Sequence, residues 1–367
     1  MVESVTNCEI CHGPTNLVLD CGEMPLANGY AESDRREPLN VRWCATCDFY
    51  QLGHYVAPDT LFRDYAYRAG SAGQTKQFES LAMACFERAR IGAVIDIGGN
   101  DGSLLDALGG GTNVDPYAPA QEWDVVRKPW GTNVIADIER PVDLICAANV
   151  WAHLPDLHNA AEAVAALLAV DGWFVIQAPW HRDLWLYNEF DTIYHEHRYY
   201  WGIRAVRALM QRHGMDVHDV EYLPNVHGGT LRYWVQHGNE EVSDAVERFA
   251  DIERLAASQV APQSAYDAWC HGHHREWEKN RQGALALGAP AKATMYWAMT
   301  NTAQYVSRVF DDATPKHNQR VPGTQLVIES FAQFPAHTSA PVVAMAWNAK
   351  PALTKRVREL GYTGRVL

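Results

Sequence analysis

The sequence predicts an α/β protein, and three observations support that fold class. From about Phe78 onward, short apolar segments alternate with segments whose apolar residues recur at helical spacing, which is typical of a parallel sheet with connecting helices. The 367 residues are enough for two or three domains with cores of their own. Two Cys-x-x-Cys pairs near the N-terminus indicate a small metal-stabilised unit before the α/β region.

Composition narrows the classes of partner. The chain has 31 Lys and Arg against 44 Asp and Glu, a net charge of −13, with 47% hydrophobic and 20% charged residues. This describes an acidic globular protein without the basic excess that duplex nucleic acid requires. The N-terminus has neither a basic start nor an apolar core, and the apolar runs are too short to cross a bilayer. We therefore expect a cytoplasmic protein without nucleic acid or membrane partners, whose cysteines stay reduced.

The cysteines predict the first domain. The pairs Cys8-Glu-Ile-Cys11 and Cys44-Ala-Thr-Cys47 are separated by 32 residues, and four thiolates in two such knuckles can close a tetrahedral structural Zn²⁺ site. A redox role is the alternative, but paired knuckles match metal geometry better than a redox motif does. The other cysteines lack such pairing and are expected to be small buried hydrophobic residues, namely Cys21, Cys85, Cys146 and Cys270.

A glycine-rich turn follows the first strand of the α/β region. Residues 93–97 are predicted to form a buried strand and residues 103–108 a helix, and Gly98-Gly99-Asn100-Asp101-Gly102 joins them. Glycines there let the backbone approach a ligand at the carboxyl edge of the sheet. A second strand, 112–114, ends at Asp115, whose carboxylate is placed to accept hydrogen bonds from ribose hydroxyls. Because the pattern Gly-x-Gly-x-x-Gly is absent, this nucleoside site favours S-adenosylmethionine over NAD.

Two further strands bring polar groups to the same edge. Residues 142–148 and 173–177 are predicted to be buried strands, and residues 149–156 directly follow the first of them, where ligands bind in open sheets. His153 is well placed there for chemistry, although a histidine at a helix terminus is the alternative, and spacing alone does not decide. The candidate cofactor-binding residues are Asp96, Gly98, Asn100, Gly102, Asp115 and Asn149.

Residues 191–200 concentrate groups that transfer protons. Two histidines, a glutamate, an aspartate and three tyrosines lie within these ten residues, a density that a solvent-exposed loop does not need. A metal site built from His195, Glu196 and His197 is the alternative. We favour acid–base chemistry because the metalloprotease pattern His-Glu-x-x-His is missing.

With the motifs around them, these residues resemble the three-domain sugar C-methyltransferases, which methylate carbon 3 of thymidine-diphosphate 4-keto deoxysugars. The shared motifs run in order over nearly the whole chain. They are the paired Cys knuckles with residues 24–28, the stretch 65–68, the turn 97–102, and the segments 149–156, 191–197, 227–232, 288–292, 311–312, 315–316, 321–324 and 346–348.

The resemblance implies roles for individual residues. The family's Tyr-His-Glu-His motif lines its active site through residues that match Tyr194, Glu196 and His197. An earlier active-site histidine matches His153, and a tyrosine near the sugar matches Tyr67 or, as second choice, Tyr65. The chain departs from the family at Gly99 (usually serine), Asp115 (usually glutamate), Tyr200-Trp201-Gly202 (usually Tyr-Phe-Ser) and Met295-Tyr296-Trp297 (usually leucines and asparagine). The last two departures bear on the exact substrate.

The implied reaction needs a base and a donor for an oxyanion. A C–H bond beside a ketone is acidic because its loss gives an enolate. His197 is the expected base, since imidazole titrates near neutral pH. Tyr194 and His153 are the expected donors to the enolate oxygen, and Glu196 is expected to orient a partner or hold a substrate hydroxyl.

An anionic nucleotide sugar requires local cations in an acidic chain. Lys292, Lys316 and Arg320 lie in loop-like segments near the C-terminus, and Arg232 lies in the 227–232 motif, so all four are candidate substrate-binding residues. Exposed solubilising charges are the alternative for Lys316 and Arg320. The cluster His271-Gly-His273-His274 is expected to be solvated helix surface.

Motif order predicts three domains. Residues 1–75 form a zinc-binding domain, residues 76–240 a Rossmann-like domain that binds S-adenosylmethionine, and residues 241–367 a Rossmann-like α/β domain that contributes to nucleotide binding. The expected enzyme is a C-methyltransferase of a nucleotide-linked keto sugar, acting as a monomer or homodimer. The alternatives are a C-methyltransferase of another ketone or sugar carbon and a non-catalytic, zinc-stabilised binding protein.

Overall fold

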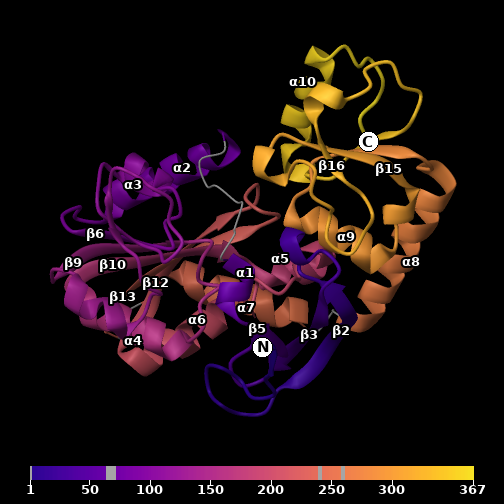
Figure 1. Cartoon of the computed structure of the whole chain (residues 1–367). Coiled ribbons are helices and arrows are strands. Elements are labelled where there is room, and N and C mark those ends of the chain that lie inside the picture. Colours follow the sequence, from indigo (N-terminus) through magenta and orange to yellow (C-terminus); the bar gives the residue numbers. More distant parts are fainter. Residues whose placement is uncertain (1, 63–71, 239–241, 258–260) are drawn as a thin grey trace.

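The computed structural model describes residues 2–62, 72–238, 242–257 and 261–367, and three sheets organise it (Figure 1). These sheets have four, seven and four strands, and a fourth sheet has two. The α/β class predicted from the sequence is confirmed. Among the described residues, no helix combines the length and apolar character needed to cross a bilayer.

An antiparallel sheet in the order β11-β4-β3-β2 forms the N-terminal part, accompanied by the β1-β5 pair. In β3, the buried residues Leu39 and Val41 alternate with a less buried neighbour, as in a strand with one face on a core. The elements are β1 (Val2–Ser4), β2 (Asn16–Pro25), η1 (Tyr30–Glu32), β3 (Arg36–Cys44), β4 (Phe49–Leu52), β5 (His54–Val56) and α1 (Pro58–Phe62).

The fourth strand of this sheet comes from much later in the chain. Strand β11 (Tyr199–Tyr200) pairs Tyr199 with Gln51 and Tyr200 with Tyr50 on β4. Because β11 is the end of the proton-transfer segment 191–200, this pairing holds that segment against the N-terminal sheet.

The central sheet has the order β12-β13-β10-β9-β6-β7-β8, in which β13 runs antiparallel to both of its neighbours. Its strands are β6 (Val94–Ile97), β7 (Thr112–Val114), β8 (Asp124–Val126), β9 (Val142–Ala148), β10 (Leu168–Pro179), β12 (Met215–Leu223) and β13 (Thr230–His237). The helices of this region are α2 (Ala72–Arg88), α3 (Ser103–Leu108), η2 (Thr132–Asp137), α4 (Leu157–Leu167), α5 (His181–Leu186), η3 (Phe190–Thr192), α6 (Ile203–Met210) and η4 (Gln211–His213).

The order of the central sheet defines where a ligand binds. Strands β7 and β8 extend the sheet on one side of β6, whereas β9 and β10 extend it on the other, all in parallel. The crevice at the carboxyl ends of β6 and β9 is therefore a topological switch point, the usual ligand site of an open α/β sheet. The glycine turn follows β6, and Asn149 follows β9.

A separate sheet of order β16-β15-β14-β17, in which all strands are parallel, forms the C-terminal part, drawn in orange and yellow in Figure 1. Its strands are β14 (Ala284–Leu287), β15 (Val306–Asp311), β16 (Ile328–Ser330) and β17 (Val342–Ala344). The helices here are α7 (Asp244–Ala257), α8 (Pro262–Asn280), α9 (Ala291–Thr300), η5 (Ala303–Tyr305), η6 (Thr314–Lys316), η7 (Phe331–Gln333), η8 (Trp347–Ala349) and α10 (Lys350–Glu359).

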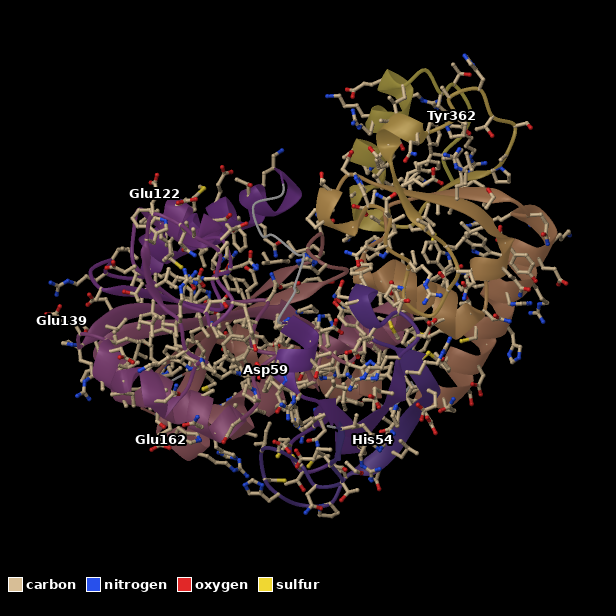
Figure 2. All side chains as sticks on the ribbon, in the orientation of Figure 1. His54, Asp59, Glu122, Glu139, Glu162 and Tyr362 are labelled. Atoms are coloured by element: carbon tan, nitrogen blue, oxygen red, sulfur yellow. The ribbon has the colours of Figure 1, made fainter. Side chains whose placement is uncertain are left out.

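The largest core joins the N-terminal sheet to the central one. It is a continuous cluster that includes Leu19, Phe49 and Trp201 together with Ile145 and Phe174 of the central sheet. Figure 2 shows side chains filling the space between the elements, with the exposed Glu122, Glu139 and Glu162 at the outer surface. The N-terminal unit is thus packed onto the central unit, and the domain limits at residues 75 and 240 stay predictions.

Candidate active site

The four predicted zinc ligands lie together. The sulfur atoms of Cys8, Cys11, Cys44 and Cys47 are all within 4.8 Å of one another, and those of Cys11 and Cys44 are 3.6 Å apart. Sulfurs at the corners of a tetrahedron around Zn²⁺, with bonds of about 2.3 Å, are about 3.8 Å apart. The cluster therefore fits one closed, structural zinc ion.

Replacing Cys44 with serine is expected to remove one zinc ion per chain, because a serine hydroxyl is a much poorer zinc ligand than a thiolate. The variant should lose solubility, whereas the turnover number of the protein that stays soluble should change less, because the cluster stabilises the N-terminal fold. Elemental analysis and sedimentation check this result. Cys270→Ser, at a cysteine on α8 outside the cluster, is the control and should keep its metal. A cysteine cluster that is metal-free in active wild-type protein would contradict the assignment.

The glycine turn after β6 adopts the tight shape that the sequence predicts. Gly98, Asn100 and Gly102 have positive φ values of 63°, 48° and 83°. A Cβ on Gly98 would lie 2.4 Å from Cγ2 of Val150. Only glycine fits there, so the turn passes directly beside the loop that follows β9.

Asp115, directly after β7, forms a hydrogen bond with the same turn. Its Oδ2 accepts a hydrogen bond from the backbone N–H of Asn100 (3.0 Å), and its Oδ1 accepts one from the N–H of Tyr117 (2.8 Å). Burial raises the pKa of Asp115, which those two amides oppose. Asp96 is 2% exposed at the end of β6, and burial raises its pKa well above the ordinary value. Both acids lie at or near the carboxyl ends of their strands, and their roles in cofactor binding stay predictions.

Asn149 completes the crevice from β9. It has a positive φ of 60°, and its backbone N–H donates to the carbonyl of Gln177 (2.8 Å). Its side-chain Oδ1 is buried and has no hydrogen-bond partner within the described part of the chain. A buried, unpaired acceptor beside a glycine turn fits a ligand that carries hydroxyl or ammonium donors. These residues therefore fit S-adenosylmethionine.

Two histidines and a tyrosine form the centre of the proton-transfer group. The rings of His153 and His197 stack with centroids 5.2 Å apart, and the ring of Tyr194 lies 4.0 Å from that of His197. Nδ1 of His197 contacts the carbonyl of Thr192 (2.8 Å), and Nδ1 of His153 contacts the carbonyl of Glu196 (2.6 Å). Because a carbonyl only accepts, both Nδ1 atoms donate, which leaves Nε2 of each imidazole as an acceptor.

Glu196 lies beside this pair with one oxygen free. Its Oε1 accepts from Nδ2 of Asn28 (3.0 Å), whereas Oε2 has no partner among the described residues. Burial raises the pKa of Glu196 to about 7. His195 lies apart, with Nε2 donating to the carbonyl of Glu37 (3.2 Å). No metal-binding group among the described residues includes this segment, so the alternative metal site is not formed.

Electrostatics keep His197 neutral. Burial lowers its pKa well below the ordinary value, and the neighbouring His153 and Lys292 lower it further. The uncharged imidazole therefore has its Nε2 lone pair available at neutral pH. Burial also lowers the pKa of His153. His227 has a positive φ of 49°, and its Nε2 has no hydrogen-bond partner among the described residues. Burial and the charge of Lys292 lower its pKa to about 4. In the sequence, this histidine stands out only as part of the 227–232 motif.

Lys292 links the proton-transfer group to the C-terminal unit. It lies in the first turn of α9, and its Nζ is 4.6 Å from the ring centroid of Trp347. Its charge lowers the pKa values of His197 and His227, and it opposes the burial that raises the pKa of Glu189. Among the candidate cations, Lys292 is thus the one close to the candidate catalytic residues.

The other two C-terminal cations are engaged by the protein. Nζ of Lys316 donates to the carbonyl of Ala289 (3.0 Å) and lies 3.9 Å from Oδ2 of Asp311. Arg320 forms an ion pair with Asp34 of the N-terminal unit (2.6 Å). Their role in phosphate binding stays a prediction.

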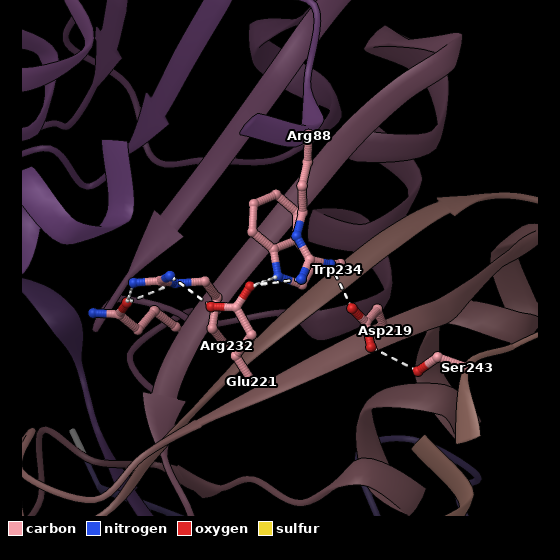
Figure 3. A network of polar contacts seen from close by, with 7 residues as sticks. Arg88, Asp219, Glu221, Arg232, Trp234 and Ser243 are labelled. Carbon is pink, nitrogen blue, oxygen red and sulfur yellow. Dashed lines mark hydrogen bonds and ion pairs between the residues drawn. The ribbon is translucent and has the colours of Figure 1, made fainter. Parts of the chain in front are cut away.

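The position of Arg232 disagrees with its predicted role in substrate binding. On β13 it is 2% exposed, with Nη1 donating to Glu221 (2.8 Å) and Nε and Nη2 to Oε1 of Gln177 (3.2 and 3.1 Å). Figure 3 shows this network, in which Arg88 joins Glu221 to Asp219. Because all of its donor-bearing atoms face the sheet, we correct the prediction: Arg232 is a structural residue of the central sheet.

A cavity of about 380 Å³ opens between the segment 188–191 and the C-terminal unit. Four large aromatic side chains and two carboxylates line it, among other residues: Trp269, Trp277, Tyr296, Trp347, Glu189 and Asp191. This cavity is not predictable from sequence patterns, because its walls come from four separate segments. The density of aromatic residues around Tyr296 was the available signal.

Two histidines of the 271–274 cluster contact groups on α9. His273 contacts the hydroxyl of Tyr296 (2.9 Å), and His274 contacts the carbonyl of Thr300 (2.9 Å). Because α9 packs on α8, only His271 of this cluster is exposed, and the expectation of a solvated surface is wrong for the other two. Tyr67 and its alternative Tyr65 lie outside the described residues.

Three family models match consecutive parts of the chain. They are described as "Putative zinc binding domain" over residues 8–62, "Methyltransferase domain" over residues 71–220 and "C-methyltransferase C-terminal domain" over residues 225–366. The chain belongs to the three-domain, S-adenosylmethionine-dependent C-methyltransferases. The predicted enzyme class, cofactor and zinc-binding domain of this C-methyltransferase are thereby confirmed.

Known proteins resemble the C-methyltransferase to different extents. C-methyltransferase NovU of Streptomyces niveus is 28% identical over 396 residues, covering 98% of this chain and 94% of that protein. A 1,6-didemethyltoxoflavin-N1-methyltransferase of Burkholderia thailandensis, solved with S-adenosylhomocysteine, is 17% identical with a TM-score of 0.33, over 46% of this chain and 80% of its own. An S-adenosylmethionine-dependent methyltransferase of Clostridium acetobutylicum is 12% identical with a TM-score of 0.35, over 49% of this chain and 96% of its own.

Proposed function

We propose that the C-methyltransferase acts on a nucleotide-linked keto deoxysugar and methylates the carbon beside the ketone, carbon 3 of a thymidine-diphosphate 4-keto sugar. The observation that carries this proposal is that Lys292 is near two other features. Its charge acts on His197 of the proton-transfer group, and its Nζ packs on Trp347, which lines the aromatic cavity. A sugar, a diphosphate and a nucleobase match the proton-transfer group, the cation and the cavity respectively.

Each feature has a chemical use. His197, neutral and with Nε2 as acceptor, is the proposed base that removes the proton beside the ketone. Tyr194 is the proposed donor to the enolate oxygen, and Tyr67 is proposed to lie near the sugar. His153, which was also expected to donate to this oxygen, does not fit that role as a neutral ring, because its Nδ1 donates to the carbonyl of Glu196 and its Nε2 is an acceptor. Glu196 is proposed to hold a sugar hydroxyl through Oε2. S-adenosylmethionine supplies the electrophilic methyl group, and the enolate carbon forms the new bond as the methyl–sulfur bond breaks.

The cavity supports a nucleotide rather than a bare ketone. Aromatic walls stack on a base, and the carboxylates of Glu189 and Asp191 can accept a hydrogen bond from a pyrimidine N–H.

We also propose the limits 1–75, 76–240 and 241–367 for the three domains. They are supported by a zinc cluster, a cofactor crevice and a parallel sheet in successive parts of the chain.

A mass-spectrometric screen of nucleotide sugars tests the proposed function. With S-adenosylmethionine present, a thymidine-diphosphate 4-keto deoxysugar should gain the mass of one methylene group. The same sugar nucleotide with a hydroxyl at carbon 4 is the matched control and should gain nothing, because it cannot form the enolate. Equal gain with both compounds, or gain with free ketones alone, would overturn the proposal.

Lys292→Met is expected to raise KM for the nucleotide sugar by about 10- to 100-fold, since a charge-assisted hydrogen bond to a phosphate contributes about 1.5–3 kcal/mol. The turnover number should change much less than KM, because Lys292 is proposed to bind the diphosphate and reaches the chemical step only through its charge near His197. Steady-state kinetics separate the two parameters. Lys355→Met, at a lysine that is 81% exposed on α10, is the matched control; an unchanged KM in the Lys292 variant would remove this residue from the substrate site.

The pH profile of kcat/KM is expected to rise through about pH 7. Burial raises the pKa of Glu196 to about 7, so its carboxylate is lost as the pH falls through that value. The pKa of His197 is lowered well below the ordinary value, so the imidazole is already neutral over this range. Glu196→Gln should abolish the rise. A wild-type profile that falls between pH 6 and 8 would show that the protonated form of Glu196 is the active one.

A further inference from the structure

Asn28 connects the N-terminal unit to the proton-transfer group. It lies in the loop between β2 and η1, and its Nδ2 donates to Oε1 of Glu196 (3.0 Å), 168 residues further along the chain. Glu196 is 1% exposed, and its Oε2 has no hydrogen-bond partner in the part of the chain that the structure describes. The two oxygens of this buried carboxylate therefore differ, because the protein holds one and leaves the other open to a ligand.

A tight turn fixes the backbone at Asn28. The N–H of Gly29 donates to the carbonyl of Leu26 (3.0 Å), and the N–H of Tyr30 donates to the carbonyl of Asn28 (2.9 Å). A Cβ on Gly29 would lie 2.9 Å from Cβ of Leu26, which is closer than two carbon atoms pack. A larger residue would force the turn open and move Asn28 relative to Glu196.

The C-terminal unit holds the other end of the same loop. The hydroxyl of Tyr30 donates to the carbonyl of Ala289 (3.1 Å), and the carbonyl of Ser33 accepts from the N–H of Gly323 (2.7 Å). Because contacts on both sides fix the loop, the amide of Asn28 meets the carboxylate in a set position, as a supporting residue of an active site must.

The bond from Asn28 favours the ionised form of Glu196, because an amide N–H donates and a charged carboxylate only accepts. Burial raises the pKa of Glu196 to about 7. The backbone amide of Glu196 itself and the side-chain and backbone amides of Asn28 oppose that rise. Removing the side-chain donor is therefore expected to raise the pKa further.

The ionisable neighbours of Glu196 stay neutral near pH 7. Tyr30 on η1 and Tyr200 on β11 are close enough for its charge to act on them, and burial raises the pKa of both phenols. The ring of His153 binds the backbone carbonyl of Glu196, and burial lowers the pKa of this imidazole. A titration near pH 7 at this place therefore reports Glu196 itself.

We propose that Asn28 is a positioning residue for Glu196. Its amide holds Oε1 and keeps the carboxylate ionised, so that Oε2 is left to accept a hydrogen bond from a sugar hydroxyl. Asn28 acts through Glu196 and does not touch the reacting carbon. The inference rests on the role proposed for Glu196, and it gives the N-terminal unit a part in catalysis in addition to zinc binding.

The pH profile of kcat/KM tests this assignment in the full chain. In Asn28→Ala, the midpoint of the rise should move up from about pH 7 by about one pH unit, the size of a hydrogen bond to a charged group. Activity at pH 7 should then fall about 5-fold and return towards the wild-type value at higher pH. Asn28→Leu, which is similar in size and keeps water out of the gap, should shift the midpoint at least as far.

Asn16→Ala is the matched control. Asn16 is an exposed asparagine on β2 of the same unit, and its variant should keep the wild-type midpoint. A wild-type midpoint in both Asn28 variants would overturn the proposal, and so would an equal shift in Asn16→Ala.

Infrared difference spectroscopy follows Glu196 without substrate. The band of its protonated carboxyl group is identified by its absence in Glu196→Gln, and its loss with rising pH should have a midpoint about one pH unit higher in Asn28→Ala than in wild type. An unchanged infrared midpoint would contradict the inference. A shifted infrared midpoint, together with a wild-type kcat/KM that does not rise near pH 7, would support the link from Asn28 to Glu196 and contradict the catalytic role proposed for Glu196.

Discussion

Replacing His197 with asparagine is expected to lower turnover by about 10²–10⁴-fold, the usual contribution of a positioned general base. Asparagine can still donate to the carbonyl of Thr192, as Nδ1 of His197 does at 2.8 Å, but it has no basic nitrogen. Exchange of the sugar proton in deuterated buffer, with S-adenosylhomocysteine bound, should be lost. Affinity for S-adenosylhomocysteine should stay nearly unchanged, because the proposed cofactor site is built by the turn after β6 and by Asp115 after β7, away from the segment that carries His197.

His195→Asn is the matched control for this experiment. His195 belongs to the same segment, yet it donates to the carbonyl of Glu37 and lies apart from the stacked rings of His153 and His197. Its variant should keep proton exchange. Wild-type exchange in the His197 variant would assign the base to another residue, with His153 as the next candidate.

Gly98→Ala is expected to weaken binding of S-adenosylhomocysteine by about 10- to 100-fold. The new Cβ would lie 2.4 Å from Cγ2 and 3.0 Å from Cβ of Val150, at a residue whose φ is 63°. The turn must move to relieve this overlap, and returning it to the binding geometry costs about 1–3 kcal/mol. Isothermal titration calorimetry measures the change.

Gly272→Ala is the control for the Gly98 variant. It lies on α8, where an added Cβ meets nothing within 4 Å, and alanine favours a helix over glycine. This variant should bind like wild type and unfold at a slightly higher temperature. Unchanged affinity in Gly98→Ala would show that the ligand does not depend on the turn after β6.

Local patterns were enough to predict the parts of the site that lie close together in sequence. The cysteine pairs, the turn from Gly98 to Gly102 and Asp115 each follow from a short motif whose geometry is set by neighbouring residues. The carboxyl edge of a parallel sheet then brings Asp115 and Asn149 to one crevice, because successive strands end on the same side. Residue spacing was therefore sufficient there.

Features that depend on packing between distant segments were not predictable. Arg232 looked like a substrate cation because a sequence does not reveal that Glu221 and Gln177 lie on strands near it. His273 looked exposed because the packing of α9 on α8 is not encoded in a short pattern. The aromatic cavity and the pairing of β11 with β4 have the same cause, since both join segments far apart in the chain.

The position of the new methyl group tests the central claim most directly. The enzyme is incubated with a thymidine-diphosphate 4-keto deoxysugar and S-adenosylmethionine labelled with ¹³C in the methyl group, and the product is analysed by NMR. We predict a methyl signal coupled to carbon 3 of the sugar, with a chemical shift typical of a methyl group on carbon. A methyl signal at the shift of a methoxy group, or one coupled to a carbon not adjacent to the ketone, would contradict the enolate mechanism.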